Sequence, residues 1–471
     1  MITFGTDGWR GVIADDFTFA NVALVAQAIA DYLTEQGVAD RGVVVGYDNR
    51  FLAERFADTV AAVLRGRGIP VLLSERPRPT PVIAFAVRHY GAAGAVMLTA
   101  SHNPPEYSGL KFIPDYAGPA LPRITRAIEE HLRRRESGSV LYPAEPGAGS
   151  RGAEVRSIDP DRAYHRHLAQ LIDFAAIRRA GVKVVVDPLY GAGIGYLETA
   201  LGGDGVTVEA LHARRDPLFG GSLPDPSEKH LGELRERVLA TGAHLGLGLD
   251  GDADRLGVID ADGSYVSPNQ FLALAAFHLY EVRGEHGPLA RTVATTHLVD
   301  RIARAYGHEV IETPVGFKYI AQCLLERGAV AGGEESGGFS MRGHIPEKDG
   351  ILAGLLAAEM VAVHGKSLTS LLEDVMRRFG RVCSERVDIR TAPAAKERVL
   401  ERLGSLAPAS LGGRAVEERV TLDGVKLVRD DGAWVLVRAS GTEPVFRVYT
   451  EAGTPDDAAA MRREVRAALG L

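Results

Sequence analysis

The sequence predicts an α/β protein in which three segments of alternating strands and helices precede a small α+β domain. Short Val-rich runs such as 42–48 and 95–99 alternate with helical patterns such as 19–35 and 53–67. This alternation is typical of a mostly parallel, doubly wound sheet. From about Cys383 the pattern changes to closely spaced strands and one final helix. Ligands of doubly wound sheets bind beyond the carboxyl ends of the strands, so the loops that follow strands are the candidate sites.

The remaining elements divide the chain further. A stretch at 137–156 is rich in Gly, Ser and Pro, has no periodicity and is interpreted as a linker. Two more α/β segments follow it, with strands expected at 182–187, 244–249, 291–295 and 329–333 and a helix at 351–363. The last segment is expected to contain strands at 424–428, 434–437 and 445–449 and a helix at 455–469. The length of 471 residues suggests about three domains, with two or four within range.

Composition excludes several classes of function. Lys and Arg total 54 and Asp and Glu total 61, a formal charge of −7, so general binding to nucleic acids or anionic membranes is not expected. We expect no membrane span and no signal peptide, because neither a charge-free apolar run of about 20 residues nor a basic, apolar leader is present. Two cysteines, Cys323 and Cys383, are too few for a disulfide framework or a Cys-based zinc site. We therefore expect a cytoplasmic protein.

A cluster of carboxylates follows the strand expected at 244–249. Asp250, Asp252 and Asp254 occupy alternate positions. Such carboxylates can converge on one hard cation if the loop curves, and Gly251 permits the bend. The alternative is a solvated acidic turn, in which the three charges would repel one another.

A serine-containing turn at 99–105 follows the strand expected at 95–99. Ser101 is a candidate nucleophile or phosphate carrier, because loops at strand ends present side chains to a crevice. The alternative is a plain turn, in which Ser and Asn cap backbone groups and the prolines fix the direction of the chain.

Two basic residues are candidates for anion binding. Arg10 stands beside Gly11 in a glycine-rich start, where it either clamps an anion or is an exposed cation of an N-terminal turn. Lys111 lies ten residues after Ser101. It is a surface lysine by default, and a proton donor or phosphate contact if it turns inward.

Two polar loops in the second half are candidates for recognition of phosphate and sugar. The loop 438–444 offers an arginine fork, two hydroxyls and a glycine amide, which suit a phosphate. The loop 332–338 has adjacent carboxylates and a hydroxyl, which suit sugar hydroxyls. Each would also be acceptable as an ordinary turn.

Together these loops resemble those of the α-D-phosphohexomutase family. The resemblance covers essentially the whole chain and is carried by residues 4–11, 99–104, 250–255, 333–337 and 438–444. It implies three doubly wound α/β domains plus a C-terminal α+β domain around a central active-site cleft. The boundaries expected for the four domains are 1–140, 158–256, 257–372 and 380–471.

The resemblance also implies roles for individual residues. Ser101 would carry a phosphoryl group, and Asp250, Asp252 and Asp254 would hold one Mg²⁺ together with an oxygen on Ser101. The groups expected around the phosphoserine are Arg10, His102, Lys111 and Arg255, with Lys111 and Arg10 as candidates for proton transfer. The residues expected to bind substrate are Arg255, Gly316, Phe317, Lys318, Glu334, Ser336, Arg438, Ser440, Gly441 and Thr442.

The implied reaction interconverts a hexose 1-phosphate and its 6-phosphate through a phosphoserine and a 1,6-bisphosphate. Phe317 stands where members that handle both mannose and glucose phosphates usually have a histidine, and Gly337-Gly338 stands where they often have Gly-His. These departures favour glucose phosphates, with glucose 1,6-bisphosphate as activator. Phosphomannomutase or dual specificity is the alternative, followed by phosphoglucosamine mutase.

Two further classes remain as remote alternatives. A metal-dependent serine phosphohydrolase would use Ser101 and the aspartates but would have little use for a second phosphate grip at Arg438. A non-catalytic sugar-phosphate sensor would have no reason to keep both the serine and the aspartates. In each case the partner is a small sugar phosphate rather than nucleic acid or membrane, and the protein is expected to be a monomer or a dimer.

Overall fold

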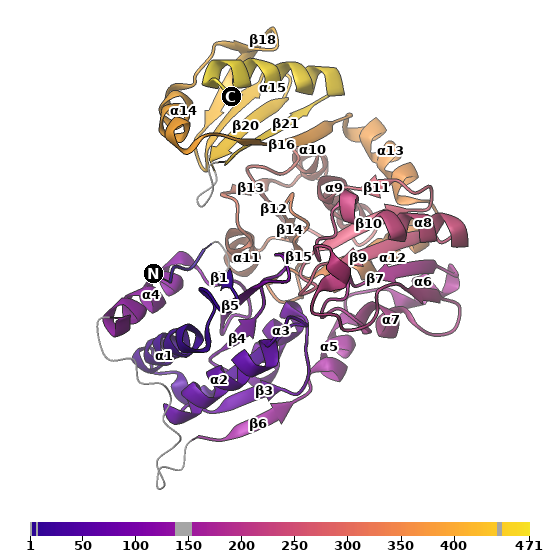
Figure 1. The fold of residues 1–471 in the computed structure, drawn as a ribbon. Helices are drawn as coiled ribbons and strands as arrows, with labels where there is room; N and C mark the ends of the chain where they lie inside the picture. Colours follow the sequence, from indigo (N-terminus) through magenta and orange to yellow (C-terminus); the bar gives the residue numbers. More distant parts are fainter. Residues whose placement is uncertain (1, 6–7, 137–152, 440–444) are drawn as a thin grey trace.

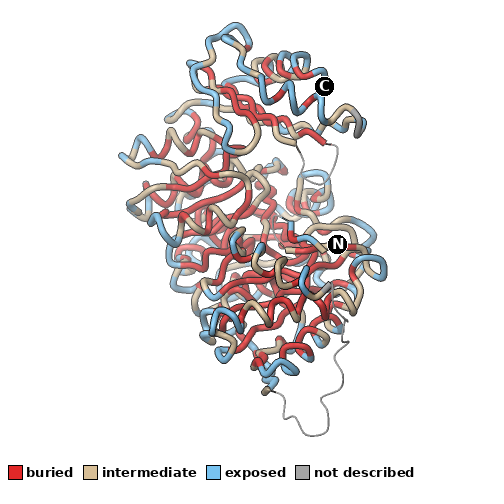
Figure 2. The backbone as a smooth tube through the Cα atoms, turned by 90° about the vertical axis from the view of Figure 1, so that its left-hand side faces the viewer, coloured by how far each residue is buried: buried red, intermediate tan, exposed pale blue. Residues whose placement is uncertain are grey.

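A computed structural model describes residues 2–5, 8–136, 153–439 and 445–471. These residues form four sheets, each covered by helices, which we call domains I to IV in chain order (Figure 1). Buried backbone runs through the sheets, and exposed residues lie mainly on outer turns and helix faces (Figure 2). The fold class predicted from the sequence, three α/β domains followed by an α+β domain, is confirmed.

Domain I contains a six-stranded sheet of order β1-β5-β4-β2-β3-β6. Its strands are β1 (Trp9–Val12), β2 (Val43–Tyr47), β3 (Val71–Ser74), β4 (Gly94–Leu98), β5 (Tyr107–Pro114) and β6 (Val155–Ile158). Its helices are α1 (Phe19–Glu35), α2 (Ala53–Gly66), α3 (Thr80–Tyr90) and α4 (Pro122–Glu136), with a 3-10 turn at η1 (Ala39–Arg41).

Alternation along β2 explains why this sheet is covered on both faces. Val43 and Val45 pack into the core that α1, α2 and α4 build on one face, whereas Val44 packs with residues of α3 on the other. Parallel strands buried on both faces are expected to be continuously apolar. The sequence of β2 shows this pattern, and all five of its residues are buried.

The interpretation of 137–156 as a linker is wrong at its end. Residues 155 and 156 begin β6, which pairs in parallel with β3, because that edge of the sheet is free to accept another strand. Residues 137–152 lie outside the described residues.

Domain II contains a five-stranded sheet of order β11-β10-β9-β7-β8. Its strands are β7 (Lys183–Asp187), β8 (Thr207–Ala210), β9 (Leu245–Leu249), β10 (Leu256–Asp260) and β11 (Tyr265–Val266). Its helices are α5 (Asp161–Leu168), α6 (Phe174–Arg179), α7 (Tyr196–Leu201) and α8 (Gly232–Thr241), with 3-10 turns at η2 (Phe219–Gly221) and η3 (Glu228–His230). The sheet extends to Val266, past the boundary expected at residue 256, because β10 pairs with both β9 and β11.

Domain III contains a four-stranded sheet of order β13-β12-β14-β15. Its strands are β12 (Leu289–Thr292), β13 (Val310–Thr313), β14 (Ala331–Gly333) and β15 (Phe339–Met341). Its helices are α9 (Pro268–Glu281), α10 (Leu298–Ala305), α11 (Phe317–Glu326), α12 (Gly350–His364) and α13 (Leu368–Phe379). The strand expected at 291–295 ends earlier, at Thr292, because the hydroxyl of Thr292 accepts a bond from the amide of Ala294 and stabilises a turn.

Helix α12 is buried along most of its length and joins domains II and III. Residues 350–361 are all buried, and the helix contacts α6, α7 and β9 of domain II as well as α9 and β15 of domain III. Its apolar residues belong to one core cluster that includes side chains of both sheets. No described helix is long and apolar enough by itself to span a membrane, and α12 and α13 pass that test only as a pair bent by 76°.

Domain IV contains an antiparallel sheet of order β16-β21-β20-β19-β18-β17. Its strands are β16 (Cys383–Arg390), β17 (Ser410–Leu411), β18 (Arg414–Val420), β19 (Val425–Arg429), β20 (Trp434–Ala439) and β21 (Val445–Ala452), and its helices are α14 (Pro393–Ser405) and α15 (Pro455–Leu469). The two helices pack on one face of the sheet and complete its apolar core. The other face contacts domain III, where Trp434 packs with Val293 and Ala294. Lys426 also lies 2.6 Å from Glu312 of domain III.

Candidate active site

Ser101 lies directly after β4 and faces the loop that follows β9. It is 1% exposed, and its hydroxyl donates a hydrogen bond of 2.6 Å to Asp250 Oδ2. Its backbone is left-handed, with φ 52°, and its amide donates to the hydroxyl of Thr99 at 2.8 Å. The structure therefore brings together the serine loop (residues 99–107) and the aspartate loop (residues 250–255), which are far apart in the sequence.

The two loops are in direct backbone contact. A Cβ atom on Gly251 would lie 2.4 Å from the carbonyl oxygen of Ser101. Contacts between carbon and oxygen at that distance are repulsive, so any side chain here would push the two loops apart. The glycine between Asp250 and Asp252 is thus required by the close approach of the serine loop.

Asp250, Asp252 and Asp254 form a buried cluster beyond the end of β9. One carboxylate oxygen from each lies within 4.8 Å of the others. Burial, followed by the charges of Asp254 and Asp252, raises the pKa of Asp250 well above its usual value. Among the described residues, Asp252 Oδ1 and Asp254 Oδ1 accept no hydrogen bond although both atoms are buried. An all-oxygen donor set with bare carboxylate atoms fits a hard divalent cation such as Mg²⁺.

Lys111 lies beside this cluster because β5 pairs with β4. It stands opposite Met97 in that pairing. Its ammonium group donates to Asp252 Oδ2 at 2.9 Å and to Asp254 Oδ2 at 3.0 Å. Burial opposes ionisation of Asp252, but the charge of Lys111, the hydrogen bonds from Thr80 and Lys111 and the charge of Lys348 together outweigh it, and the pKa of Asp252 is lowered. Lys111 is therefore turned inward, which excludes the surface lysine.

Arg10 and His102 surround the serine from the side of domain I. Arg10 lies on β1, opposite Gly109 of β5, and its guanidinium donates to Asn103 Oδ1 at 2.6 Å. His102 Nδ1 lies 3.4 Å from Ser101 Oγ. The charge of Arg255, then burial and the charge of Arg10, lower the pKa of His102 to about 2, so this imidazole is neutral at physiological pH.

Loops of domain III adjoin the aspartates through Lys348, which lies 3.3 Å from Asp254 Oδ2. The same ammonium group lies 5.7 Å from the ring of Phe317, the first residue of α11. Glu334 Oε1 accepts a bond of 2.9 Å from the amide of Gly316. Burial and the charge of Glu335 raise the pKa of Glu334 to about 7. The structure thus brings Gly316, Phe317 and Glu334 together next to the aspartate loop.

The other two residues of domain III that were expected to bind substrate are more exposed to solvent. Lys318 and Ser336 are partly exposed. Lys318 lies with its ammonium group 5.6 Å from the ring of Tyr319. Arg255, next to the aspartates, forms a backbone bridge with Gly338, so the loop that carries Ser336 is attached to the aspartate loop.

Arg438 lies near the end of β20, on the side of domain IV that faces domain III. Its guanidinium donates to Asp423 Oδ2 at 2.8 Å, and the same oxygen accepts from the amide of Val315 at 3.0 Å. Val315 immediately precedes Gly316, so Asp423 connects the arginine to the domain III loop. Ser440, Gly441 and Thr442 lie outside the described residues.

Sequence reasoning missed several residues that hold the site. Arg50 donates to four carbonyl groups of the serine loop, Thr80 donates to Asp252 Oδ2 at 2.6 Å, and Lys348 contacts Asp254. The polar run Asp48-Asn49-Arg50 directly after an apolar strand was a usable signal for the first of these. Thr80, at the start of α3, and Lys348, within the run Glu347-Lys348-Asp349, gave no comparable signal, because neither residue directly follows a strand.

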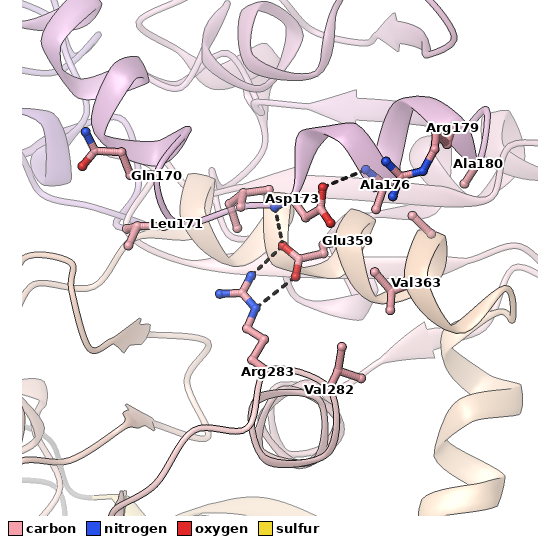
Figure 3. Close-up of a pocket in the computed structure, with 12 residues that line it drawn as sticks. Gln170, Leu171, Asp173, Ala176, Arg179, Ala180, Val282, Arg283, Glu359 and Val363 are labelled. Atoms are coloured by element: carbon pink, nitrogen blue, oxygen red, sulfur yellow. Dashed lines mark hydrogen bonds and ion pairs between the residues drawn. The ribbon is translucent and has the colours of Figure 1, made fainter.

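A cavity of about 780 Å³ between domains II and III lies away from these loops. Figure 3 shows Glu359 in its wall, where its carboxylate accepts hydrogen bonds from Nε and Nη2 of Arg283 and from the backbone amide of Asp173. His278 is a further partner of the same carboxylate. A carboxylate with all of these partners is a structural group, and this cavity adds no reactive group to the site.

Four domain families match the chain in order. They are the phosphoglucomutase/phosphomannomutase alpha/beta/alpha domains I, II and III, at residues 1–139, 162–263 and 267–379, and the C-terminal domain at 388–468. A phosphoglucomutase/phosphomannomutase from Thermococcus kodakarensis is 33% identical over 97% of this chain and 95% of its own length. A probable phosphoglucosamine mutase from Methanothermobacter thermautotrophicus is also 33% identical, over 99% of this chain and 97% of its own length.

Solved structures of proteins described as phosphohexomutases also superpose on this chain over nearly its whole length. A Thermus thermophilus protein described as a phosphomannomutase superposes with a TM-score of 0.84 at 36% identity, covering 100% of this chain and 99% of that one. Parafusin from Paramecium superposes with a TM-score of 0.85 at 22% identity, over 99% of this chain and 94% of that one, which shows a shared fold. With all four domain families matched in order, the chain belongs to the phosphoglucomutase/phosphomannomutase family of α-D-phosphohexomutases.

Proposed function

We propose that this protein interconverts glucose 1-phosphate and glucose 6-phosphate through a phosphoserine at residue 101 and a glucose 1,6-bisphosphate intermediate. The observation that carries the proposal is the 2.6 Å hydrogen bond from Ser101 to Asp250, at the edge of a buried cluster of three carboxylates. A serine hydroxyl aimed at a cation site is the arrangement that phosphoryl transfer requires, because the reaction depends on alignment and on neutralising the charge of the phosphoryl oxygens.

Asp250, Asp252 and Asp254, with an oxygen on Ser101, would hold one Mg²⁺. When bound, the cation would supply Lewis-acid stabilisation of charge on the transferred phosphoryl group. The protein's own cations add to this stabilisation. The guanidinium groups of Arg10 and Arg255 would bind phosphoryl oxygens from two sides.

Proton transfer to and from the sugar hydroxyl falls to Lys111. Its ammonium group is 3% exposed and lies between Asp252 and Asp254. The same carboxylates would help to hold the cation, and the buried ammonium group is placed to exchange a proton with the sugar hydroxyl. Arg10 is the second candidate. His102, neutral beside Arg255, would orient the phosphoserine through a hydrogen bond rather than act as an acid.

The sugar and its non-reacting phosphate would bind between domains III and IV. Glu334 and Ser336 offer oxygens to sugar hydroxyls, and Gly316, Phe317 and Lys318 form the adjoining loop. Arg438, with Ser440, Gly441 and Thr442, would grip the distal phosphate through an arginine fork, hydroxyls and an amide. The bisphosphate intermediate must reverse its orientation in the site, so its non-reacting phosphate must bind equally well in both orientations. A phosphate-binding loop on a separate domain meets this requirement.

The preference for glucose phosphates is supported by Phe317 and by Gly337-Gly338. Members that handle both glucose and mannose phosphates usually have a histidine in place of Phe317 and often have Gly-His in place of Gly337-Gly338. Phosphomannomutase is the close alternative. Phosphoglucosamine mutase is a further one, because several relatives at 31–33% identity carry that name. We also infer a cytoplasmic enzyme, acting as a monomer or dimer on small sugar phosphates.

Initial rates on the 1-phosphates of glucose, mannose and glucosamine test the proposal. Each assay contains Mg²⁺ and a trace of the matching 1,6-bisphosphate, and both the 6-phosphate product and free phosphate are followed. A preference for glucose without phosphate release supports the proposal. Comparable rates on two sugars indicate a dual-specificity mutase instead. A preference for glucosamine phosphate indicates a phosphoglucosamine mutase. Steady release of phosphate indicates a hydrolase, and binding without turnover indicates a sensor.

A further inference from the structure

Arg50 lies beneath the serine loop and binds its backbone at four points. The side chain is fully buried. One terminal nitrogen donates to the carbonyl groups of Pro104 at 2.7 Å and Tyr107 at 2.9 Å. The other donates to those of Ser101 and Asn103, both at 2.7 Å. The loop that carries the reactive serine is thus wrapped around one guanidinium group.

The arginine itself is held by Asp48, which is bound to β4, and by an aromatic ring of domain II. The amide of Arg50 donates to Asp48 Oδ1 at 2.9 Å, and its Nε lies 3.4 Å from Asp48 Oδ2. Its guanidinium carbon lies 5.0 Å from the ring of Phe219 in domain II. The amide of Asp48 donates to the carbonyl group of Leu98, the last residue of β4. The group under the serine loop therefore has little freedom to move.

Asn49, the preceding residue, binds a different loop. Its side-chain amide donates to the carbonyl groups of Tyr190 at 2.9 Å and Gly191 at 2.7 Å. Tyr190 has a left-handed backbone, with φ 60°, a conformation that a bulky residue adopts only under external constraint. The two bonds from Asn49 supply such a constraint.

The loop that Asn49 binds supports the aspartates. The amide of Ala192 donates to the carbonyl group of Gly251 at 2.9 Å. A Cβ atom on Gly191 would lie 2.9 Å from the carbonyl oxygen of Asp250, so the two backbones touch. Adjacent residues on one turn of domain I thus hold the serine loop directly and the aspartate loop through one intervening segment.

We propose that Asn49 and Arg50 are positioning residues that set the distance and orientation of Ser101 relative to the loop of Asp250, Asp252 and Asp254. Arg50 holds the left-handed turn at the serine, and Asn49 holds the support of the aspartate loop at a fixed separation from it. Neither residue touches the reacting atoms. The kinetic part of this inference rests on the proposed function, whereas its structural part concerns only the two loops.

Arg50→Lys is the informative substitution. Lysine keeps the positive charge but lacks the planar fork that serves four carbonyl groups at once. We expect kcat to fall about 100-fold, the loss typical of a displacement of about 1 Å in a reacting group. KM for glucose 1-phosphate should stay within about threefold, because none of these contacts reaches the substrate, so the transition state alone is affected.

Asn49→Ala is the second variant and does not alter the serine loop directly. We expect a several-fold rise in the Mg²⁺ concentration that gives half-maximal rate. Arg429→Lys is the matched control, since Arg429 is another buried arginine whose partners, Asp431 and Asp457, lie in domain IV. It should lose stability without a change in kcat per folded molecule.

Amide hydrogen exchange without Mg²⁺ or substrate provides a readout independent of activity. Arg50→Lys should accelerate exchange at least tenfold at residues 100–103, and Asn49→Ala at residues 251–254, while Arg429→Lys changes neither segment. Exchange as in the wild type, or unchanged kcat in folded Arg50→Lys, would overturn the inference. If the wild-type protein interconverts no sugar phosphate, the proposed function fails, and the exchange data alone then decide this inference. If Arg50→Lys does not fold, Asn49→Ala decides it by both readouts.

Discussion

The hydroxyl of Ser101 points at the carboxylate of Asp250, 2.6 Å away, before any phosphate is attached. This contact closes the space between the end of β4 in domain I and the end of β9 in domain II. A phosphoryl group added to Ser101 would replace the hydroxyl proton and extend toward the same carboxylates. Like charges would then face each other, so the phosphorylated form is expected to require a cation at this point.

Ser101→Ala should abolish mutase activity and leave the fold intact, because it removes the atom that accepts phosphate and little packing volume. The loss should exceed about 1,000-fold in kcat, since no other nucleophile replaces the hydroxyl. Rates with added glucose 1,6-bisphosphate and a thermal melt measure the two effects. Near-normal turnover in the variant would exclude the phosphoserine mechanism.

Asp252→Asn should weaken Mg²⁺ binding and reduce the activity that depends on Mg²⁺. The substitution removes one of three buried carboxylates but keeps a polar side chain of the same size. Mg²⁺ should raise the melting temperature of the wild-type protein, because a ligand that binds only the folded state stabilises it. A smaller rise is expected in the variant. Equal Mg²⁺ dependence in the two proteins would remove Asp252 from the metal site.

Glu334 should make both activity and stability depend on pH near 7. Burial and Glu335 raise its pKa to about 7, above the ordinary value of 4.5. A raised carboxyl pKa means that the folded state holds the proton more tightly than the unfolded state, so this contribution to stability is lost as pH rises from about 4.5 through 7. If the ionised carboxylate binds the sugar, kcat/KM should rise over the same pH range.

Glu334→Gln tests both statements. Glutamine keeps an oxygen that can accept from the amide of Gly316 but cannot ionise. The variant should gain stability relative to the wild type at pH 8 but not at pH 4, and its profile of kcat/KM should be flatter around pH 7. Parallel melting and rate measurements across this range give the answer. A variant profile that still rises through pH 7 would assign the titration to another group.

The contact between Lys426 and Glu312 should contribute to the docking of domain IV. Glu312→Gln leaves a buried ammonium group without its carboxylate, which should cost about 2–3 kcal/mol because Glu312 is partly exposed. Lys426→Met removes the buried charge and leaves Glu312 its ion pair with Arg291, so its loss should be smaller than that of Glu312→Gln. Denaturant unfolding of both variants compares them. Equal losses would show that the lysine stabilises through packing rather than through its charge.

The sequence predicted the elements that depend on local periodicity. The helix expected at 19–35 is α1, and the final helix at 455–469 is α15. The strands that precede the serine and the aspartates were also correct within one residue. These segments are strongly patterned, because each buries one or both faces against a neighbour that is close in the chain.

The sequence did not predict the groups that support these loops. Arg50 acts on backbone carbonyl groups, which every residue has, so its four partners leave no pattern of side chains. Lys348 reaches Asp254 only because α12 packs against domain II. The end of the supposed linker at 155–156 is a strand because of its pairing with β3, which lies more than eighty residues earlier in the chain. Each of these depends on contacts between distant segments.

The burial of helix α12 has a consequence for how the protein unfolds. Because its buried residues belong to one apolar core with side chains from both β9 and α9, domain III cannot separate from domain II without exposing that core to water. The two sequence families that meet near residue 265 therefore describe one cooperative unit in thermodynamic terms. A fragment cut between them should lack a stable fold on either side, whereas domain IV, with an apolar core of its own, is suited to melt as a separate step.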